Sequence, residues 1–452
     1  MRIALIHDWL TGMRGGEKCL EILCRRFPDA RLFTLLHIPG ATSPAIDRMA
    51  ITTSILQRIP GAGRHYRWLL PLMPRAVERL RIPADVDLVV SLSHAVAKNV
   101  RPPSGVPHVC YCFTPIRYAW HRREDYFAPR RPVSVAPRHQ ADRAEASPPH
   151  RGRNTPCAVP DLRHAECAYY SGVGGYSGAG GLVLRILSPA RDRVLDRIRD
   201  WDRAASSRVT QFVAISRTVA GRIADAYGRT SRVIYPPVDT RFYTPDAAPR
   251  EDWYLCVSAL VPYKRIDLAI AACNRLGRRL VVIGAGPEHG RLARLAGPTV
   301  RLLGWRTNEE IRDHLRRARA LVFPANEDFG IVPLEAQACA TPVIAFGQGG
   351  ATETVLPVRP GRPGTGWFFD EQTPESLLDA IGRFESQRVW FDPALARLQA
   401  ERFAADRFER ELIEYLEETA FGKGPMRIQG TKGRVQGPGH GVQDFVADGV
   451  WM

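Results

Sequence analysis

The residues most suited to chemistry lie in the segment Phe323–Ala336. Glu327 and Glu335 stand eight positions apart, the first in a loop after an apolar strand and the second in the following helix, with Gly330 between them. The backbone N–H groups at the start of that helix have no partner within the helix and favour an anion. Two acids at this spacing are often merely solvated, but the loop and the glycine favour an anion-binding site.

A lysine after another predicted strand could bind a phosphate. Lys264 and Arg265 lie in Val261–Asp267, between the apolar run Trp253–Val257 and a helix. Ligands of open α/β sheets bind at the carboxyl ends of the strands, where this lysine would stand. The alternative is a solvated, charged helix start.

Glycine turns follow two more strands. The turn Gly284-Ala285-Gly286-Pro287-Glu288 follows Leu280–Ile283, and the loop Gly347–Gly350 follows Pro342–Phe346. The next glycine after Gly286 is Gly290, so the G-x-G-x-x-G spacing of a dinucleotide site is missing. This spacing excludes a dehydrogenase.

Short apolar runs alternate with helix-length amphipathic segments along most of the chain, a pattern that indicates parallel sheets covered on both faces. The runs form one series before residue 207 and one after it, so the α/β chain is predicted to contain two doubly wound, Rossmann-like domains. Residues 128–181 and 421–452 are rich in Gly and polar residues and are predicted to be a disordered insertion and a disordered tail. Residues 393–420 predict C-terminal helices.

Composition supports an ordinary globular protein. The 452 residues are 45% hydrophobic and 24% charged, and the N-terminal apolar run is too short for a signal peptide, so a cytoplasmic location is expected. The nine cysteines contain no C-x-x-C pair and predict reduced, mostly buried thiols. The net charge of +16 favours phosphate-bearing partners, and residues 1–127 supply half of it with 18 basic and 10 acidic residues.

These motifs together resemble the retaining glycosyltransferases of family 4, which have the GT-B fold. The resemblance covers roughly residues 1–127 and 183–420, and each piece is weak alone. In the second half it rests on Val261–Arg265, Gly284–Glu288, Glu327-x7-Glu335 and Gly347–Gly350. The first half is similar to the mannosyltransferase-type branch that elongates polysaccharides, through Gly15–Lys18, Ser91–Lys98, Tyr111–Tyr118 and Tyr235–Asp239.

The resemblance implies two domains facing a central cleft, with an acceptor side at 1–206, a nucleotide-sugar donor side at 207–392 and a C-terminal helix crossing back. It implies that Glu327 contacts donor sugar hydroxyls, that Lys264 neutralises the diphosphate and that His94 approaches the sugar. Without the family, His94 could equally be a buried structural imidazole. The implied donor-binding residues are Gly15, Gly16, Arg265, Gly284, Gly286, Pro287, Glu288, Phe329, Gly330, Ile331, Val332 and the ribose-binding Glu335. Many relatives have an arginine shortly before the lysine, where this chain has Ser258-Ala259-Leu260.

The expected activity is retaining hexosyl transfer, with mannosyl from GDP-mannose as the first hypothesis and a lipid-linked or polysaccharide acceptor. Asp85-Val86-Asp87 has the D-x-D form of a cation site but precedes its strand, so no metal and no cofactor are expected. A UDP-sugar donor, a catalytically dead nucleotide-sugar-binding protein and a basic nucleic-acid-binding protein remain alternatives. No nucleic-acid recognition motif supports the last of these.

A membrane partner is suggested by the segment Ser54–Ile82. It mixes six arginines with Trp68 and several aliphatic residues, which is the composition of a helix lying on an anionic membrane. The alternative is that Trp68–Met73 packs into the core and the arginines are solvated.

Overall fold

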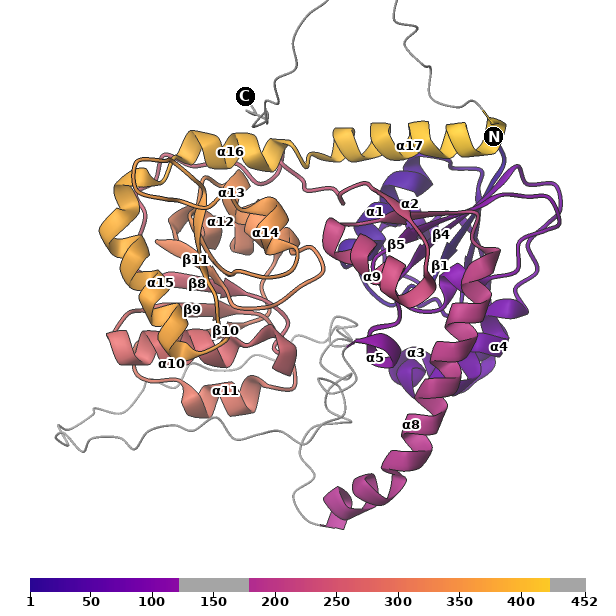
Figure 1. The fold of residues 1–452 in the computed structure, drawn as a ribbon, viewed down its shortest axis with the longest axis horizontal. Helices are drawn as coiled ribbons and strands as arrows, with labels where there is room; N and C mark the ends of the chain where they lie inside the picture. The colour runs from indigo at the N-terminus through magenta and orange to yellow at the C-terminus, as the bar shows by residue number, and fades with distance from the viewer. Residues whose placement is uncertain (122–178, 423–452) are drawn as a thin grey trace, which may run out of the picture.

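The computed structural model describes residues 1–121 and 179–422. Two bodies lie side by side, each built on one parallel sheet (Figure 1). The first sheet has the strand order β3-β2-β1-β4-β5-β6-β7 and the second the order β10-β9-β8-β11-β12-β13. This arrangement of two Rossmann-like sheets with helices confirms the predicted fold class.

The strands of the first sheet are short apolar runs, because a parallel sheet covered by helices is buried on both faces. All five residues of β1 and all six of β4 are buried. The strands are β1 (Ile3–His7), β2 (Arg31–Thr34), β3 (Ala50–Thr53), β4 (Leu88–Ser93), β5 (His108–Cys112), β6 (Gln211–Ala214) and β7 (Ser231–Val233). The second sheet consists of β8 (Tyr254–Val257), β9 (Leu280–Ile283), β10 (Val300–Gly304), β11 (Ala320–Phe323), β12 (Val343–Phe346) and β13 (Gly366–Phe369).

The helices present one apolar face to these sheets. In the first, α1, Leu20, Leu23 and Cys24 are buried. The first body contains α1 (Gly15–Arg26), α2 (Pro44–Asp47), α3 (Ala62–His65), α4 (Met73–Glu78), α5 (Arg117–Trp120), α8 (Ala179–Ala205) and α9 (Arg217–Tyr227). The second contains α10 (Ile266–Leu276), α11 (His289–Leu295), α12 (Asn308–Arg317), α13 (Ile331–Ala338), α14 (Ala351–Thr354) and α15 (Pro374–Gln387). Short 3-10 turns include η1 (Ile55–Arg58), η2 (Tyr66–Leu72), η3 (Ala97–Asn99) and η6 (Pro262–Lys264).

Two C-terminal helices join the bodies. The helix α16 (Pro393–Glu401) runs along the second body and α17 (Ala405–Phe421) along the first, as the yellow ribbon at the top of Figure 1 shows. Phe408, Leu412 and Leu416 of α17 are buried in the hydrophobic cluster of the first sheet. The chain therefore crosses back to the body where it began, as expected.

The predicted boundary between residues 206 and 207 is wrong. Strand β6 pairs with β5, and β7 pairs with β6, so both belong to the first sheet. The apolar run at 209–215 was assigned to the second series because sequence periodicity shows that a strand exists but not which sheet it joins. We propose that the boundary lies between Val233 and Tyr254. The insertion expected at 128–181 lies outside the described residues up to 178, and the tail lies outside them from 423.

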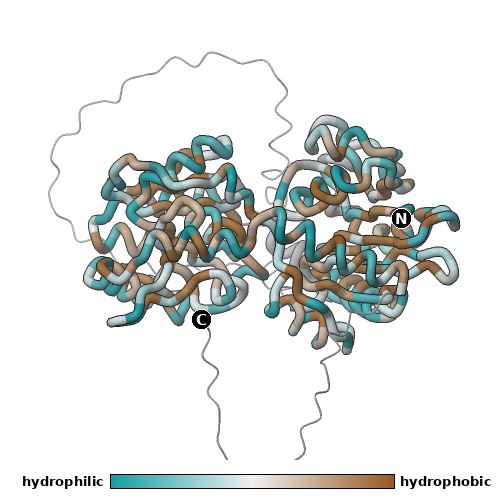
Figure 2. Tube along the Cα trace, turned by 90° about the horizontal axis from the view of Figure 1, so that it is seen from above, coloured by the Kyte–Doolittle hydropathy of each residue, from teal (hydrophilic) through white to brown (hydrophobic). Residues whose placement is uncertain are grey.

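Apolar residues are concentrated inside both bodies, as the brown strands in Figure 2 show. Phe329 and Leu334 of the second body belong to the same buried cluster as residues of the first sheet, so the two bodies share apolar packing.

All seven cysteines in the described part of the chain are free and buried, as expected for reduced thiols. No helix among residues 1–121 and 179–422 combines the length and apolar character needed to cross a bilayer.

Candidate functional site

The carboxyl ends of the two sheets meet at a junction between the bodies. Lys18 of α1 lies 3.5 Å from the carboxylate of Glu335 on α13. At Gly15 a Cβ atom would stand only 2.9 Å from Cδ1 of Ile331, the first residue of α13. Gly15 thus lets the N-termini of α1 and α13 approach each other closely, which brings two helix ends that favour anions to one place.

Glu327 and Lys264 form the ion pair at the centre of the second body's edge. Lys264 follows β8 and Glu327 follows β11, and both side chains are largely buried. Burial alone would lower the pKa of Lys264, but the adjacent Glu327 carboxylate raises it above its usual value. The lysine is therefore fully charged at neutral pH, and a bound phosphate would compete with Glu327 for it.

Glycines after β12 fix the backbone beneath Glu327. The Gly350 N–H donates to the Glu327 carbonyl oxygen at 2.8 Å. A Cβ atom at Gly350 would lie 2.2 Å from Cα of Phe329, which no side chain can occupy. The predicted loop Gly347–Gly350 therefore acts as backbone support for the glutamate loop.

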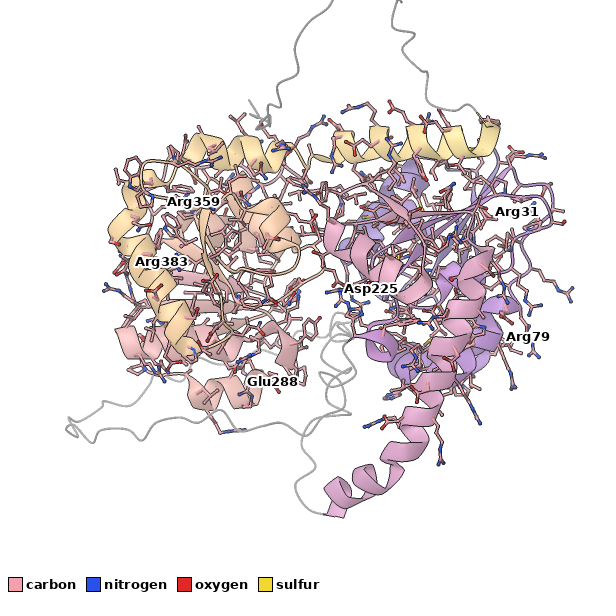
Figure 3. All side chains as sticks on the ribbon, viewed as in Figure 1. Arg31, Arg79, Asp225, Glu288, Arg359 and Arg383 are labelled. Atoms are coloured by element: carbon pink, nitrogen blue, oxygen red, sulfur yellow. The ribbon has the colours of Figure 1, made fainter. Side chains whose placement is uncertain are left out.

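The glycines after β9 have a similar packing role. A Cβ atom at Gly284 would lie 1.8 Å from the Ser258 carbonyl oxygen, and at Gly286 one would lie 2.3 Å from the Leu260 carbonyl oxygen. The turn that continues through Pro287 thus lies directly on the loop leading to Lys264. Glu288 is buried and lies 2.6 Å from Arg291, on the lower side of the second body in Figure 3. Its carboxylate therefore supports its own helix, which differs from the donor contact expected for it.

The start of α13 has the expected form of an anion site. Gly330 has φ +82, a left-handed conformation that favours glycine, and the N–H groups of Ile331 and Val332 occupy the first helical turn. The buried ring of Phe329, just before this turn, packs 5.8 Å from the rings of Tyr235 and Phe403, so its side chain joins the two bodies. Its contact with the donor stays a prediction.

Glu335 and Arg265 flank the Lys264–Glu327 pair in the fold. Glu335 is buried beside Lys18 and also interacts with Tyr243, whose pKa burial and this carboxylate raise. Arg265 has φ 51, a strained conformation for a residue other than glycine, and its side chain lies 3.3 Å from Asp267. This backbone conformation turns the chain sharply from η6 into α10 directly after Lys264.

His94 follows β4 and is held by Asp8, which follows β1. Asp8 is fully buried, and its carboxylate accepts the backbone N–H groups of residues 94–97 at 2.7 to 2.9 Å. His94 Nδ1 lies 3.2 Å from the same carboxylate. A carboxylate at this distance favours the imidazole proton on Nδ1, which leaves Nε2 as an acceptor.

Burial lowers the pKa of His94 to about 4, although Asp8 acts in the opposite direction. The imidazole is therefore neutral at neutral pH, while 34% of its side chain stays exposed. Its ring stands edge-on to Trp9 at 4.6 Å, so its orientation is fixed by packing as well as by Asp8.

The surroundings of His94 include the buried carboxylate of Glu17, which pairs with His7. His7 Nε2 is 3.5 Å from Glu17, whose pKa is lowered by His7 and Arg14 against the effect of burial. A Cβ atom at Gly16 would lie 3.2 Å from the Phe113 ring and 3.5 Å from His7 Cε1. Gly16 therefore lets the start of α1 lie directly against these side chains, beside the position where Gly15 meets α13.

The sequence alone assigned no role to four residues of this region, Asp8, Asp328, Arg117 and Arg222. Asp328 directly follows Glu327, is buried, and pairs with Arg117 of α5 at 2.6 Å and with Arg222 of α9. The sequence signal was a carboxylate or arginine at the end of a strand or early in the next helix. That signal is too common to select these residues without knowing which strands are neighbours.

Asp87 of the D-x-D segment contacts the chain's N-terminal end. Asp87 accepts the Arg2 backbone N–H at 2.7 Å at the amino end of β4, away from the junction. In the described ranges, no group of three or more His, Cys, Asp or Glu side chains is arranged to hold a metal ion.

Comparison with known proteins identifies the second body. Residues 245–401 match the family described as "Glycosyl transferases group 1". The second body is therefore similar to this family. The match covers β8 to β13 with Lys264, Glu327 and Glu335, and it confirms the resemblance inferred from their spacing.

This chain is similar to two proteins with named activities. It is 33% identical over 199 residues to a GDP-mannose-dependent alpha-(1-6)-phosphatidylinositol monomannoside mannosyltransferase of Mycolicibacterium smegmatis, covering 37% of this chain and 51% of that protein. It is 36% identical over 157 residues to a D-inositol 3-phosphate glycosyltransferase of Kineococcus radiotolerans, covering 28% of this chain and 34% of that protein. The chain thus spans about half the length, or less, of these curated relatives.

Solved structures show the same overall fold. An Anabaena protein crystallised with UDP-glucose superimposes with a TM-score of 0.58 at 17% identity, covering 92% of this chain and all of that chain (100%). A lipopolysaccharide outer core galactosyltransferase gives a TM-score of 0.55 at 14% identity, covering 94% of this chain and 100% of that chain. The chain therefore has the GT-B fold.

Proposed function

We propose that the protein is a retaining glycosyltransferase that moves a hexosyl unit, mannosyl from GDP-mannose in the first instance, to a lipid-linked or polysaccharide acceptor. The observation that carries this proposal is the buried Lys264–Glu327 pair beside the start of α13, at the carboxyl edge that faces the first body. The mannosyltransferase relative named above supports the choice of donor.

Donor binding would exchange the partners of the ion pair. The diphosphate takes the ammonium of Lys264 and the N–H groups at the start of α13, and Gly15 and Gly16 bring the start of α1 to the same place. Glu327 is then released to accept hydrogen bonds from sugar hydroxyls, and Glu335 to accept them from the ribose. These positive groups stabilise the charge that develops on the leaving diphosphate, which is the main catalytic effect.

The first body would orient the sugar and the acceptor. His94 is neutral and rigid, so its Nε2 can accept a hydrogen bond from a hydroxyl without a competing charge. Asp328, the nearest further carboxylate in sequence, is held between two arginines and is a poor nucleophile. We therefore propose retention by attack on the same face from which the diphosphate leaves, without a covalent enzyme intermediate.

We also propose that transfer needs no metal ion. Lys264 and two helix N-termini supply the positive potential that a divalent cation would otherwise provide at the diphosphate. Asp87 of the D-x-D segment pairs with Arg2 at the amino end of β4. This is the edge of the sheet opposite the junction between the bodies.

A membrane surface is the second proposed partner. The segment 54–82 forms short pieces, η1, α3, η2 and α4, and not the one continuous helix that its composition suggested. Leu69 and Leu70 pack against the core, but Ile55 and Leu72 are exposed, as are the basic residues Arg58, Arg75 and Arg81. The side chains of Arg64, Arg67 and Trp68 lie outside the described part. The exposed aliphatic and basic residues support peripheral binding to anionic lipid.

Turnover of purified full-length protein with a panel of GDP- and UDP-sugars tests the main proposal. We expect preferential consumption of GDP-mannose, an α-linked product by NMR, and unchanged rates with EDTA. Preferential use of a UDP-sugar would overturn the donor assignment, and an inverted product would overturn retention. Nucleotide binding without consumption of any sugar donor, with or without a lipid-extract acceptor, would favour the catalytically dead alternative.

A further inference from the structure

Asp328 is held by the first body although it belongs to the second. It lies in the loop between β11 and α13, one residue after Glu327, and its side chain is 3% exposed. Its carboxylate pairs with Arg117, which follows β5, and with Arg222 of α9, which follows β6. A buried carboxylate between two guanidinium groups is stable only while both remain in place, because a lost partner leaves an uncompensated charge.

The backbone of the same residue is also fixed from the first body. Ser216 Oγ donates to the Asp328 carbonyl oxygen at 2.5 Å and accepts the Val219 N–H at 3.1 Å, so it caps α9 as well. From the other side, the Gly350 N–H holds the Glu327 carbonyl oxygen at 2.8 Å. The two successive peptides on either side of Asp328 are therefore held, one by the loop after β12 and the other by α9.

We propose that Asp328 is a positioning residue. Through it, the position of the Glu327 carboxylate depends on contact between the two bodies. The proposal rests on the function proposed above. When α5 and α9 are engaged, Asp328 is neutralised and the glutamate loop is fixed with Glu327 at Lys264. When the bodies separate, Asp328 loses both arginines and Ser216, and the loop loses its support on one side. Sugar transfer is thereby restricted to the closed arrangement, while nucleotide binding through Lys264 and α13 is not.

A matched contact at the same junction provides the control. Glu353 of α14 accepts the backbone N–H groups of Arg217 and Thr218 at 2.8 and 2.9 Å, and the Tyr235 hydroxyl at 3.1 Å. It ties α9 to the second body as Asp328 does, but its contacts are with α9 and Tyr235 and not with Glu327. Glu353→Gln therefore weakens one contact of α9 with the second body and leaves the contacts of Asp328 with Arg117, Arg222 and Ser216 in place.

The test compares Asp328→Asn and Glu353→Gln in the full chain. We expect Asp328→Asn to lower kcat by about 100-fold while the Kd of GDP, measured by calorimetry, changes less than about threefold. Glu353→Gln should change kcat by less than about threefold at a similar loss of thermal stability. Equal kcat losses in the two variants, or near-normal turnover in Asp328→Asn, would overturn the proposal.

Two further measurements test the proposal if Asp328→Asn does not fold or if the wild type transfers no sugar. If Asp328→Asn does not fold, Arg222→Lys and Ser216→Ala leave the carboxylate in place, and each should lower kcat by about tenfold with GDP affinity unchanged. Normal turnover in both overturns the proposal. If the wild type binds GDP but transfers no sugar, the proposed function fails, and hydrogen exchange of residues 324–330 decides alone. Faster exchange in Asp328→Asn but not in Glu353→Gln supports the coupling, and equal exchange overturns it.

Discussion

The carboxylate of Asp8 holds the backbone of His94, at 2.7 Å to its N–H, and the ring of His94, at 3.2 Å to Nδ1. One buried side chain at the end of β1 thus fixes the position of a histidine 86 residues later, at the end of β4, and favours its Nδ1-protonated tautomer. The two strands are neighbours in the sheet, which makes this contact possible.

Asp8→Asn should destabilise the first body by about 2 to 4 kcal/mol, because an amide group would replace one carboxylate oxygen among four backbone donors. Urea unfolding measures this loss. Asp87→Asn, which removes a more exposed pair with Arg2, is the control and should leave stability nearly unchanged, because solvent screens that pair. Similar losses in the two variants would contradict the role assigned to Asp8.

Acid pH should weaken the protein partly through the Asp8–His94 pair. The folded-state pKa of Asp8 lies below its ordinary value, despite burial, because His94, His7 and the backbone donors favour the carboxylate. Its contribution is therefore present above the unfolded pKa and is lost as the pH falls through the folded one. The depressed pKa of His94, about 4, acts in the same direction, beginning below about pH 6.5.

NMR titration of the histidine ring protons checks this assignment, with His94→Gln identifying the signal. We expect the His94 signal to titrate near pH 4, with no inflection near 6.5. The rate of transfer should accordingly be independent of this group between pH 6 and 8. A His94 pKa of 6 or higher would show that the imidazole is charged in part of the working range and would reject its role as a neutral acceptor.

The two glutamates should differ in kinetic effect. Glu327→Ala is expected to lower turnover at least about a hundredfold, which corresponds to about 2.7 kcal/mol of transition-state stabilisation. Glu335→Ala should mainly raise KM for the donor, because it is expected to bind the ribose in both ground and transition states. Steady-state kinetics with the donor separates these effects, and near-normal turnover of Glu327→Ala rejects the site.

Gly350→Ala should disrupt the glutamate loop, because its Cβ would overlap the backbone of Phe329 at 2.2 Å. We expect a strong loss of activity and a lower Tm. Gly382 of α15 is the matched control, since a Cβ there meets no atom within 4 Å. Gly382→Ala should raise stability by about 0.5 to 1 kcal/mol through helix propensity alone. The loop interpretation fails if both variants behave alike.

Vesicle co-sedimentation tests membrane binding. Arg58→Ser with Arg75→Ser should reduce binding to anionic vesicles, since each basic residue near the surface contributes about 1 kcal/mol, and binding should fall with salt. Arg359→Ser with Arg362→Ser removes the same charge from the second body, where Figure 3 labels Arg359, and should have little effect. Salt-insensitive binding, or equal effects of the two pairs, would contradict the proposed surface.

The sequence by itself determined the local elements and the second half of the site. The strand at Leu280–Ile283 has the predicted bounds, and Lys264 and Glu327 were selected because each follows a strand and precedes a helix. Such predictions succeed because apolar periodicity, glycine turns and helix starts depend on residues close together in the chain.

Only the tertiary structure decided which sheet β6 and β7 join, that Asp8 holds His94, and that Asp328 is clamped by Arg117 and Arg222. It also gave Phe329 its ring packing with Tyr235, and Glu288 its ion pair with Arg291. These facts depend on strand order and on contact between two bodies. The residues in contact there are separated in the chain by 86 to more than 200 positions. No local sequence pattern specifies which residue will pair with a buried charge.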